Sequence, residues 1–296
     1  MKTPSRSHPI ATITVLAMLC VSLASAQSVK GPETLDDSCW QVSFEDPFDN
    51  LSLWNEALPA TSDSQGRWRT QYIWPRDVII NDEQQFYIDP SLHGMSAFSV
   101  TEGVLSITAQ PTPRALRGEV SGQPYISGVL TTEKSFSQKH GRFEVRAQVP
   151  EGQGFWSAFW LLPSFERWPE GVAVLPEIDV MEHLGHQPNV FHTTLHTNQT
   201  GPLTSHPYDH TEDNSLSDTF NVYSVVWNEK SVNWYLNGKW RAAHPTPADF
   251  TQPVHFLINL AVGGTWPGSP DASTEFPASF QIDYVRAYTY DTSCTG

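Results

Sequence analysis

The sequence predicts an all-β protein, either a sandwich or a barrel, from two observations. Short segments in which apolar and polar residues alternate recur along the chain, and clusters of Gly, Pro, Asn and Asp separate them. In contrast, no stretch keeps a helical period for more than one or two turns. Many short strands with closely spaced turn signals are typical of sandwiches and barrels.

The individual strands follow from this alternation. The clearest examples are residues 104–109, 141–149, 222–227, 232–236 and 280–288. The strand at 232–236 is followed by Asn237-Gly238, a strong signal for a two-residue hairpin turn. The Pro-rich stretches around 111–124 and 201–217 are expected to form surface loops.

The N-terminus predicts a secretory signal peptide over residues 1–26. Lys2 and Arg6 precede an uncharged apolar run that is too short for a comfortable membrane span. Ala24-Ser25-Ala26 then fits a cleavage site, and a lipoprotein signal at Cys20 is the alternative. No other stretch is long and apolar enough to cross a bilayer, so we expect release to the extracellular space or periplasm, without membrane attachment after cleavage.

Two cysteines remain after cleavage, one near each end of the mature chain. Residues 27–38 form a short polar leader, and residues 39–294 form a single domain with Cys39 and Cys294 at its limits. An even number of cysteines in an oxidising compartment favours a disulfide, with two free thiols as the alternative. In the chain-entropy model, closing so long a loop stabilises the fold by roughly 4–5 kcal/mol, less any strain.

Charge and aromatic content restrict the partners. The chain has 17 basic and 32 acidic residues, a formal net charge of −15, which argues against nucleic acid or an anionic membrane but not against a neutral polysaccharide. Its 11 Trp, 15 Phe and 9 Tyr residues exceed what a core readily absorbs, which suggests a surface that stacks on sugar rings.

The most informative segment places three carboxylates within six residues, Glu177-Ile178-Asp179-Val180-Met181-Glu182. Residues i and i+2 share a strand face, so Glu177 and Asp179 point one way while Ile178 points into a core. A regular strand would also bury Glu182, which is costly without a partner. We therefore predict a β-bulge at Val180–Met181 that returns Glu182 to the acidic face.

Such a constellation suits glycosidic bond cleavage. One outer carboxylate attacks the anomeric carbon, and the other is protonated at rest and donates to the leaving oxygen. A separation of about 5–5.5 Å between the two carboxyl groups gives retention of configuration, whereas a wider gap gives inversion. The alternative for an isolated pattern of this kind is an exposed acidic strand face.

With its flanking residues, the segment 176–183 resembles the active-site signature of glycoside hydrolase family 16, in the laminarinase-like branch that carries the bulge. The resemblance runs from about Phe44 to Tyr288. Its ordered matches are Gly128–Thr132, Gly141–Ala147, Gly152–Pro163, Asn259–Gly268 and Ile282–Arg286. Within the family, three segments look closest to bacterial endo-β-glycanases that cut succinoglycan-type exopolysaccharides: Asn81–Tyr87, His192–His196 and Gly268–Asp271.

The resemblance implies a jelly-roll sandwich of two antiparallel sheets with a concave substrate cleft. By matching position, Glu177 resembles the nucleophile, Glu182 the acid/base and Asp179 the assisting carboxylate. Residues implied or suggested as sugar contacts are Trp156, Trp160, Trp266, His196, Asn81, Tyr87 and Arg142, with core packing or another structural role as the alternative for most of them.

Catalysis in this family needs no cofactor, but members often carry one structural calcium ion. The matching positions are Pro47, Gly103 and Asp283, and oxygen ligands suit calcium. An ordinary salt-bridging role is the alternative for Asp283. A metal site at His192 and His196 is disfavoured because no third ligand completes the set.

The resemblance therefore implies a secreted, retaining endo-β-glucanase that cuts β-1,3 and/or β-1,4 bonds, and we expect it to be a monomer. A non-catalytic glycan-binding protein on the same fold is an alternative, although such proteins typically lose a catalytic acid. A transglycosylase that passes the glycosyl group to a sugar is another.

Overall fold

A computed structural model describes residues 29–59, 65–165 and 176–294 of the chain. The expected signal peptide lies outside these residues. The regular secondary structure of the described part is almost entirely β, with one four-residue helix and one short 3-10 turn, and none of its helices is long and apolar enough to span a bilayer. The elements are β1 (Trp40–Asp46), β2 (Gln85–Tyr87), α1 (Pro90–His93), β3 (Phe98–Thr101), β4 (Val104–Pro111), η1 (Arg114–Leu116), β5 (Tyr125–Ser127), β6 (Val129–Thr131), β7 (Gly141–Gln148), β8 (Phe155–Pro163), β9 (Glu177–Leu184), β10 (Val190–Thr197), β11 (Thr204–Thr211), β12 (Asn221–Trp227), β13 (Ser231–Leu236), β14 (Lys239–Pro245), β15 (Val254–Val262) and β16 (Ala278–Tyr290).

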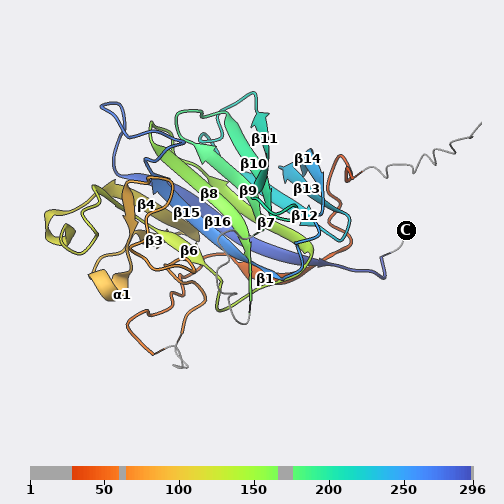
Figure 1. Ribbon diagram of the computed structural model, residues 1–296, viewed down its shortest axis with the longest axis horizontal. Coiled ribbons are helices and arrows are strands. Elements are labelled where there is room, and N and C mark those ends of the chain that lie inside the picture. Colours follow the sequence, from red (N-terminus) through yellow and green to blue (C-terminus); the bar gives the residue numbers. More distant parts are fainter. Residues whose placement is uncertain (1–28, 60–64, 166–175, 295–296) are drawn as a thin grey trace, which may run out of the picture.

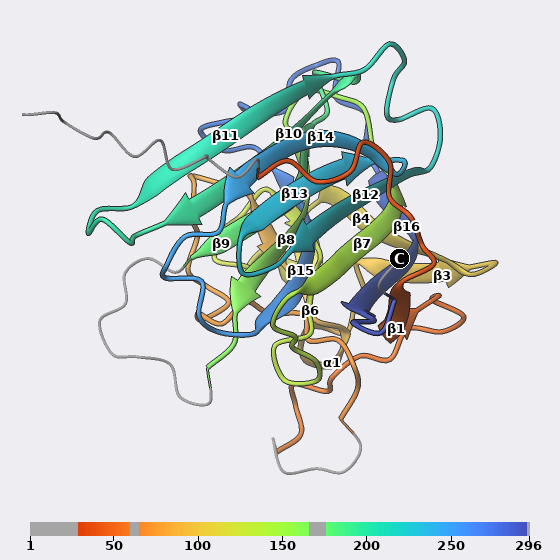
Figure 2. The same ribbon diagram turned by 90° about the vertical axis from the view of Figure 1, so that its right-hand side faces the viewer.

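The strands form two sheets packed face to face (Figure 1 and Figure 2). In the described residues, one sheet has six strands in the order β11-β10-β9-β8-β15-β6, and the other has ten, with β14-β13-β12-β7-β16-β4-β5-β2 as its main path and β1 and β3 pairing with β16 and β4. This is the expected sandwich, with a small departure: β2 and β5 pair in parallel, whereas all the other strand pairs are antiparallel.

Alternation along each strand produces the core between the sheets. On β7, Phe143 and Val145 point inward and are fully buried, and from the opposite sheet Phe159 and Phe256 meet them. The rings of Phe143 and Phe256 pack edge to face with centroids 5.9 Å apart. The other face of the six-stranded sheet does not contribute to this core.

The predicted hairpin at Asn237-Gly238 is confirmed. Leu236 pairs with Lys239, so the loop has two residues, and both have positive φ (50° and 73°). This matches the twist that a tight hairpin requires and explains why Asn and Gly occupy these positions.

Both ends of the described chain are fastened to the ten-stranded sheet. The expected disulfide joins Cys39 and Cys294 beside the β1–β16 pair. The described part of the leader does not stand free, because the backbone N–H of Gly31 donates to Asn233 Oδ1 at 2.6 Å and Thr34 forms a β-bridge with Lys239. The leader thus runs along β13 and β14.

Candidate active site

A groove of about 770 Å³ lies on the face of the six-stranded sheet that points away from the core. Outward side chains of β8, β9, β10 and β15 form its floor, and the walls come from the segment 72–83, the β10–β11 hairpin and the loop around Trp266. Its lining includes Tyr72, Asn81, Glu83, Trp156, Trp160, Glu177, Asp179, Glu182, Thr194, His196, Ser205, Asn259 and Trp266.

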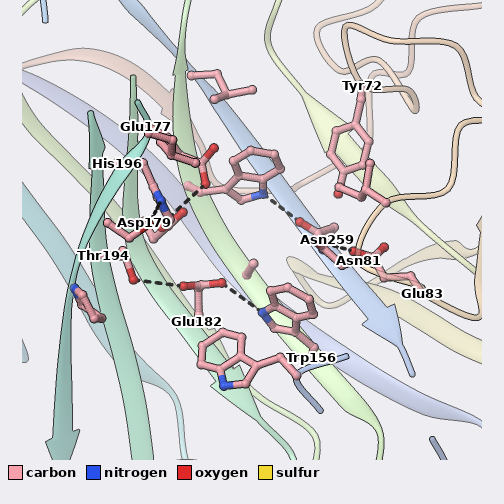
Figure 3. Close-up of a pocket in the computed structure, with 18 of the residues that line it drawn as sticks. Tyr72, Asn81, Glu83, Trp156, Glu177, Asp179, Glu182, Thr194, His196 and Asn259 are labelled. Carbon is pink, nitrogen blue, oxygen red and sulfur yellow. Dashed lines mark hydrogen bonds and ion pairs between the residues drawn. The ribbon is translucent and has the colours of Figure 1, made fainter. Parts of the chain in front are cut away.

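The predicted bulge lies in β9 at the expected place. Phe159 of β8 pairs with Met181, but the next residue of β8 pairs with Asp179, so β9 has one extra residue. The register with β10 shifts at the same point. Val180 and Met181 are both buried in the core, and as a result all three carboxylates face the groove (Figure 3).

Glu182 is held in an environment that favours its neutral form. Its Oε1 accepts a hydrogen bond from Trp156 Nε1 at 3.1 Å, and Thr194 Oγ1 donates to its Oε2 at 3.5 Å (Figure 3). The residue is 8% exposed. Burial and the charge of Glu177 together raise the pKa of Glu182 to about 8. At neutral pH this carboxyl group carries its proton.

Glu177, Asp179 and His196 form a second, coupled group. His196 Nε2 lies 3.0 Å from Asp179 Oδ2 and 3.7 Å from Glu177 Oε1. Burial lowers the pKa of His196, but the hydrogen bond to Asp179 and the two negative charges outweigh it and raise the pKa to about 9. The ring is therefore a cation that compensates the neighbouring acids.

The two acids differ in exposure. The side chain of Asp179 is 4% exposed and that of Glu177 is 27% exposed. Burial, then repulsion from neighbouring carboxylates, raises the pKa of both, to about 6 for Asp179 and well above its ordinary value for Glu177. The interaction between the two carboxyl groups raises the pKa of Glu177 and lowers that of Asp179, so the two groups titrate as a coupled pair.

The three expected tryptophans all line the groove, in different ways. Trp266 is 41% exposed, and its ring packs edge to face on Trp156 with centroids 5.2 Å apart. Trp160 is 8% exposed and donates through Nε1 to Asn259 Oδ1 at 2.8 Å. Trp266 thus offers the most accessible surface, and Trp160 belongs to a small apolar cluster on the groove side of the sheet.

The polar residues expected to contact sugar divide into two groups. Asn81 lines the groove and donates to Glu83 Oε1 at 3.1 Å. Tyr87 and Arg142 do not line it, which corrects that expectation. Tyr87 is buried behind Asn259, whose Nδ2 donates to its hydroxyl at 3.1 Å. Arg142 is on β7 of the other sheet, where it pairs with Glu144 and Asp37.

The residues considered as metal ligands lie close together in one case and apart in the other. Strand register brings Pro47, Gly103 and Asp283 together along β16, between the end of β1 and the start of β4, and a Cβ on Gly103 would lie 3.9 Å from the carbonyl oxygen of Pro47. Asp283, however, is already paired with Arg146. His192 and His196 bind different carboxylates, Asp209 and Asp179, and so do not form a common metal site.

Sequence reasoning missed several groove residues. Thr194 is two residues before His196 and therefore shares its strand face, a signal that was available. Ser205 is on β11, and its hydroxyl lies 2.8 Å from His196 Nδ1. This contact gives the second ring nitrogen a hydrogen-bond partner and so helps to orient the ring. Tyr72 and Glu83 are placed by a loop, and no periodic pattern marks them.

The chain belongs to glycosyl hydrolase family 16. The model for "Glycosyl hydrolases family 16" matches residues 90–286, and the family resemblance is thereby confirmed. An endo-1,3-1,4-beta-glycanase of Rhizobium meliloti is 38% identical over 265 residues, which is 87% of this chain and 54% of the relative. A beta-glucanase of Rhodothermus marinus is 32% identical over 298 residues, 92% of this chain and 91% of that protein.

Solved structures confirm the jelly-roll fold. The endo-beta-1,3-glucanase of Pyrococcus furiosus superposes with a TM-score of 0.70 at 29% identity, covering 88% of this chain and 99% of that one. The chain spans about half the length of the two Rhizobium meliloti relatives that it matches.

The raised pKa of Glu182 predicts a cost in stability that depends on pH. Below about pH 4, the ordinary range for Glu, the carboxyl group is protonated in both folded and unfolded states and costs nothing. As the pH rises toward 8, the unfolded state loses the proton while the folded state keeps it, so the free energy of unfolding falls.

Glu182→Gln mimics the protonated group and removes this penalty. We expect its Tm to equal that of the wild type near pH 4 and to exceed it at pH 8–9, by roughly 2–4 °C for each kcal/mol. Thermal unfolding across this range measures the difference, with the exposed Glu119→Gln as the matched control. A Tm gap that does not change with pH would contradict the assigned environment.

Proposed function

We propose that the protein is a retaining endo-β-glucanase that hydrolyses internal β-1,3 and/or β-1,4 bonds of glucans or glucose-rich exopolysaccharides. The observation that carries the proposal is the sorting of three carboxyl groups in one groove: Glu182 neutral, Glu177 accessible and beside a cationic His196. The endo-glucanase activities of the relatives supply the linkage types.

In the first step, the carboxylate of Glu177 attacks the anomeric carbon while the bond to the leaving oxygen breaks. Glu182 transfers its proton to that oxygen, and a covalent glycosyl-enzyme forms. Asp179 hydrogen-bonds Glu177, and His196 balances the charge of the pair. Glu182 and the coupled Glu177–Asp179 pair have different surroundings. Glu182 is therefore suited to proton donation and Glu177 to nucleophilic attack.

In the second step, Glu182 is a carboxylate and accepts a proton from water as that water attacks the anomeric carbon. The bond to Glu177 breaks, and the sugar leaves with its original configuration. The edge-to-face pair of Trp156 and Trp266 offers an apolar surface beside Glu182, which suits the face of a pyranose ring. Indole N–H donation from Trp156 also orients the acid between the two steps.

Substitution of the carboxylates tests the roles. Glu177→Gln and Glu182→Gln are each expected to lower turnover by at least about a thousandfold, because nucleophile and acid/base act in the same reaction. Release of reducing ends from laminarin, lichenan, carboxymethylcellulose and succinoglycan measures this, with Glu119→Gln as the active control. Turnover that survives Glu177→Gln would sink the assignment.

The same assay separates the alternatives. Binding of polysaccharide without any release by the wild type would indicate a glycan-binding protein. Constant reducing ends with redistributed chain lengths would indicate a transglycosylase. NMR of the anomeric proton at the newly released reducing end shows the configuration of the product. Retention of the β configuration supports the proposed double displacement.

The pKa values predict a bell-shaped dependence of kcat/KM on pH. Above about pH 8 the activity falls because Glu182 loses the proton that it must donate. Below about pH 6 it falls because the Glu177–Asp179 pair takes up a second proton and the nucleophile is neutralised. Initial rates on the preferred glucan across pH 4–10 measure both limbs, and an alkaline limb that persists in Glu182→Gln at residual activity would contradict the assignment to Glu182.

We also propose that the protein is secreted as a monomer after cleavage near residue 26. The signal-like N-terminus and the disulfide between Cys39 and Cys294 support this location, because such bonds persist in oxidising compartments.

A structural calcium ion near Pro47, Gly103 and Asp283 completes the proposal. Calcium has to compete with Arg146 for the carboxylate of Asp283. We expect calcium to raise the Tm of the wild type relative to EDTA, and to leave Asp283→Asn unchanged, because two carbonyls alone bind calcium weakly. Equal Tm values of the wild type in calcium and EDTA would exclude the site.

A further inference from the structure

A buried tryptophan of the opposite sheet makes a direct hydrogen bond to the backbone of the acidic strand. Trp234 is on β13, is fully buried in the main core, and donates through Nε1 to the carbonyl oxygen of Asp179 at 2.9 Å. Asp179 is the residue immediately before the extra residue of β9. The bond therefore spans the sandwich at the position of the bulge.

A bulge needs such a donor for a general reason. In a regular central strand each carbonyl points in the plane of the sheet toward a neighbouring strand, but a bulge disrupts this ladder. A buried carbonyl without a partner is costly. The indole N–H of Trp234 supplies a donor to the Asp179 carbonyl from the core.

We propose that Trp234 is a positioning residue for the acid/base group: its indole N–H holds the Asp179 carbonyl and thereby keeps β9 in the bulged register that turns Glu182 into the groove. In a regular register Met181 would face the groove and Glu182 the core. Trp234 does not touch the groove, so it acts through β9. The inference rests on the proposed function for its kinetic readout.

The chain offers a matched control in Trp227. This residue is on the neighbouring strand β12, is also fully buried in the same core, and its Nε1 has no hydrogen-bond partner among the described residues. Trp227→Phe and Trp234→Phe remove the same atoms from similar surroundings. Only the second removes a hydrogen bond to β9.

The experiment compares the wild type, Trp227→Phe and Trp234→Phe by kinetics and by NMR titration of the Glu182 carboxyl carbon. We expect Trp234→Phe to lower kcat about 10- to 100-fold with KM changed less than about twofold, as for misplacement of a catalytic group. We also expect its alkaline limb and the midpoint of the Glu182 titration to move, while Trp227→Phe keeps both.

The outcomes are separable. Wild-type kcat, alkaline limb and Glu182 titration in a folded Trp234→Phe protein would overturn the inference, as would equal losses in both variants. An inactive wild type would reject the proposed function, but the titration of Glu182 would still test Trp234. If Trp234→Phe does not fold, incorporation of benzothienylalanine at position 234 keeps the ring shape and removes only the donor, and the same readouts apply.

Discussion

One additional residue in β9 determines which side of the sheet the last acid faces. Glu177 and Asp179 reach the groove by simple strand alternation, but Glu182 does so only because Val180 and Met181 both occupy the core. A one-residue change of register moves every later side chain to the other face of the strand. The position of Glu182 therefore depends on the bulge, and the opposite sheet contacts the strand there through the hydrogen bond from Trp234 to the Asp179 carbonyl.

The groove also has to accommodate three carboxyl groups, two of them almost completely buried. The structure meets this cost in two ways. Glu182 is kept neutral by burial and accepts hydrogen bonds from an indole N–H and a hydroxyl, whereas Glu177 and Asp179 form a coupled pair beside a cationic imidazole. The two arrangements place carboxyl groups with different protonation behaviour in one groove. The rigid sandwich core underneath maintains the short distances on which both depend.

Much of this architecture follows from local pattern. The all-β class, the hairpin at Asn237-Gly238, the disulfide and the bulge all rest on alternation, turn chemistry or the cost of burying an acid, and the structure contains each of them. The resemblance to the family added the jelly-roll topology. The expectations for Tyr87 and Arg142 failed because a sequence motif does not reveal which sheet or which layer a side chain joins. The stretch 201–217, expected to be a surface loop, contains β11, because its pairing with β10 outweighs its turn-like composition.

The groove residues that the sequence did not predict depend on loop conformation and strand pairing. Tyr72 and Glu83 reach the groove through loop conformation, and Ser205 reaches His196 only because β11 pairs with β10 in one register. Asn259 occurs in a family motif, but its contact with Trp160 depends on the pairing of β8 with β15. Long-range pairing is a property of the assembled sheet, and strand periodicity alone does not encode it.

The disulfide has an implication for how the domain is connected to other structures. Cys39 and Cys294 have Cα atoms 5.6 Å apart, so entry and exit of the domain coincide on the sheet that faces away from the groove. A segment that follows Cys294 is therefore attached beside β1 and β16, in the sheet opposite to the groove. The same closeness means that Cys39 and Cys294 can be connected by a short linker and the chain opened at another exposed turn.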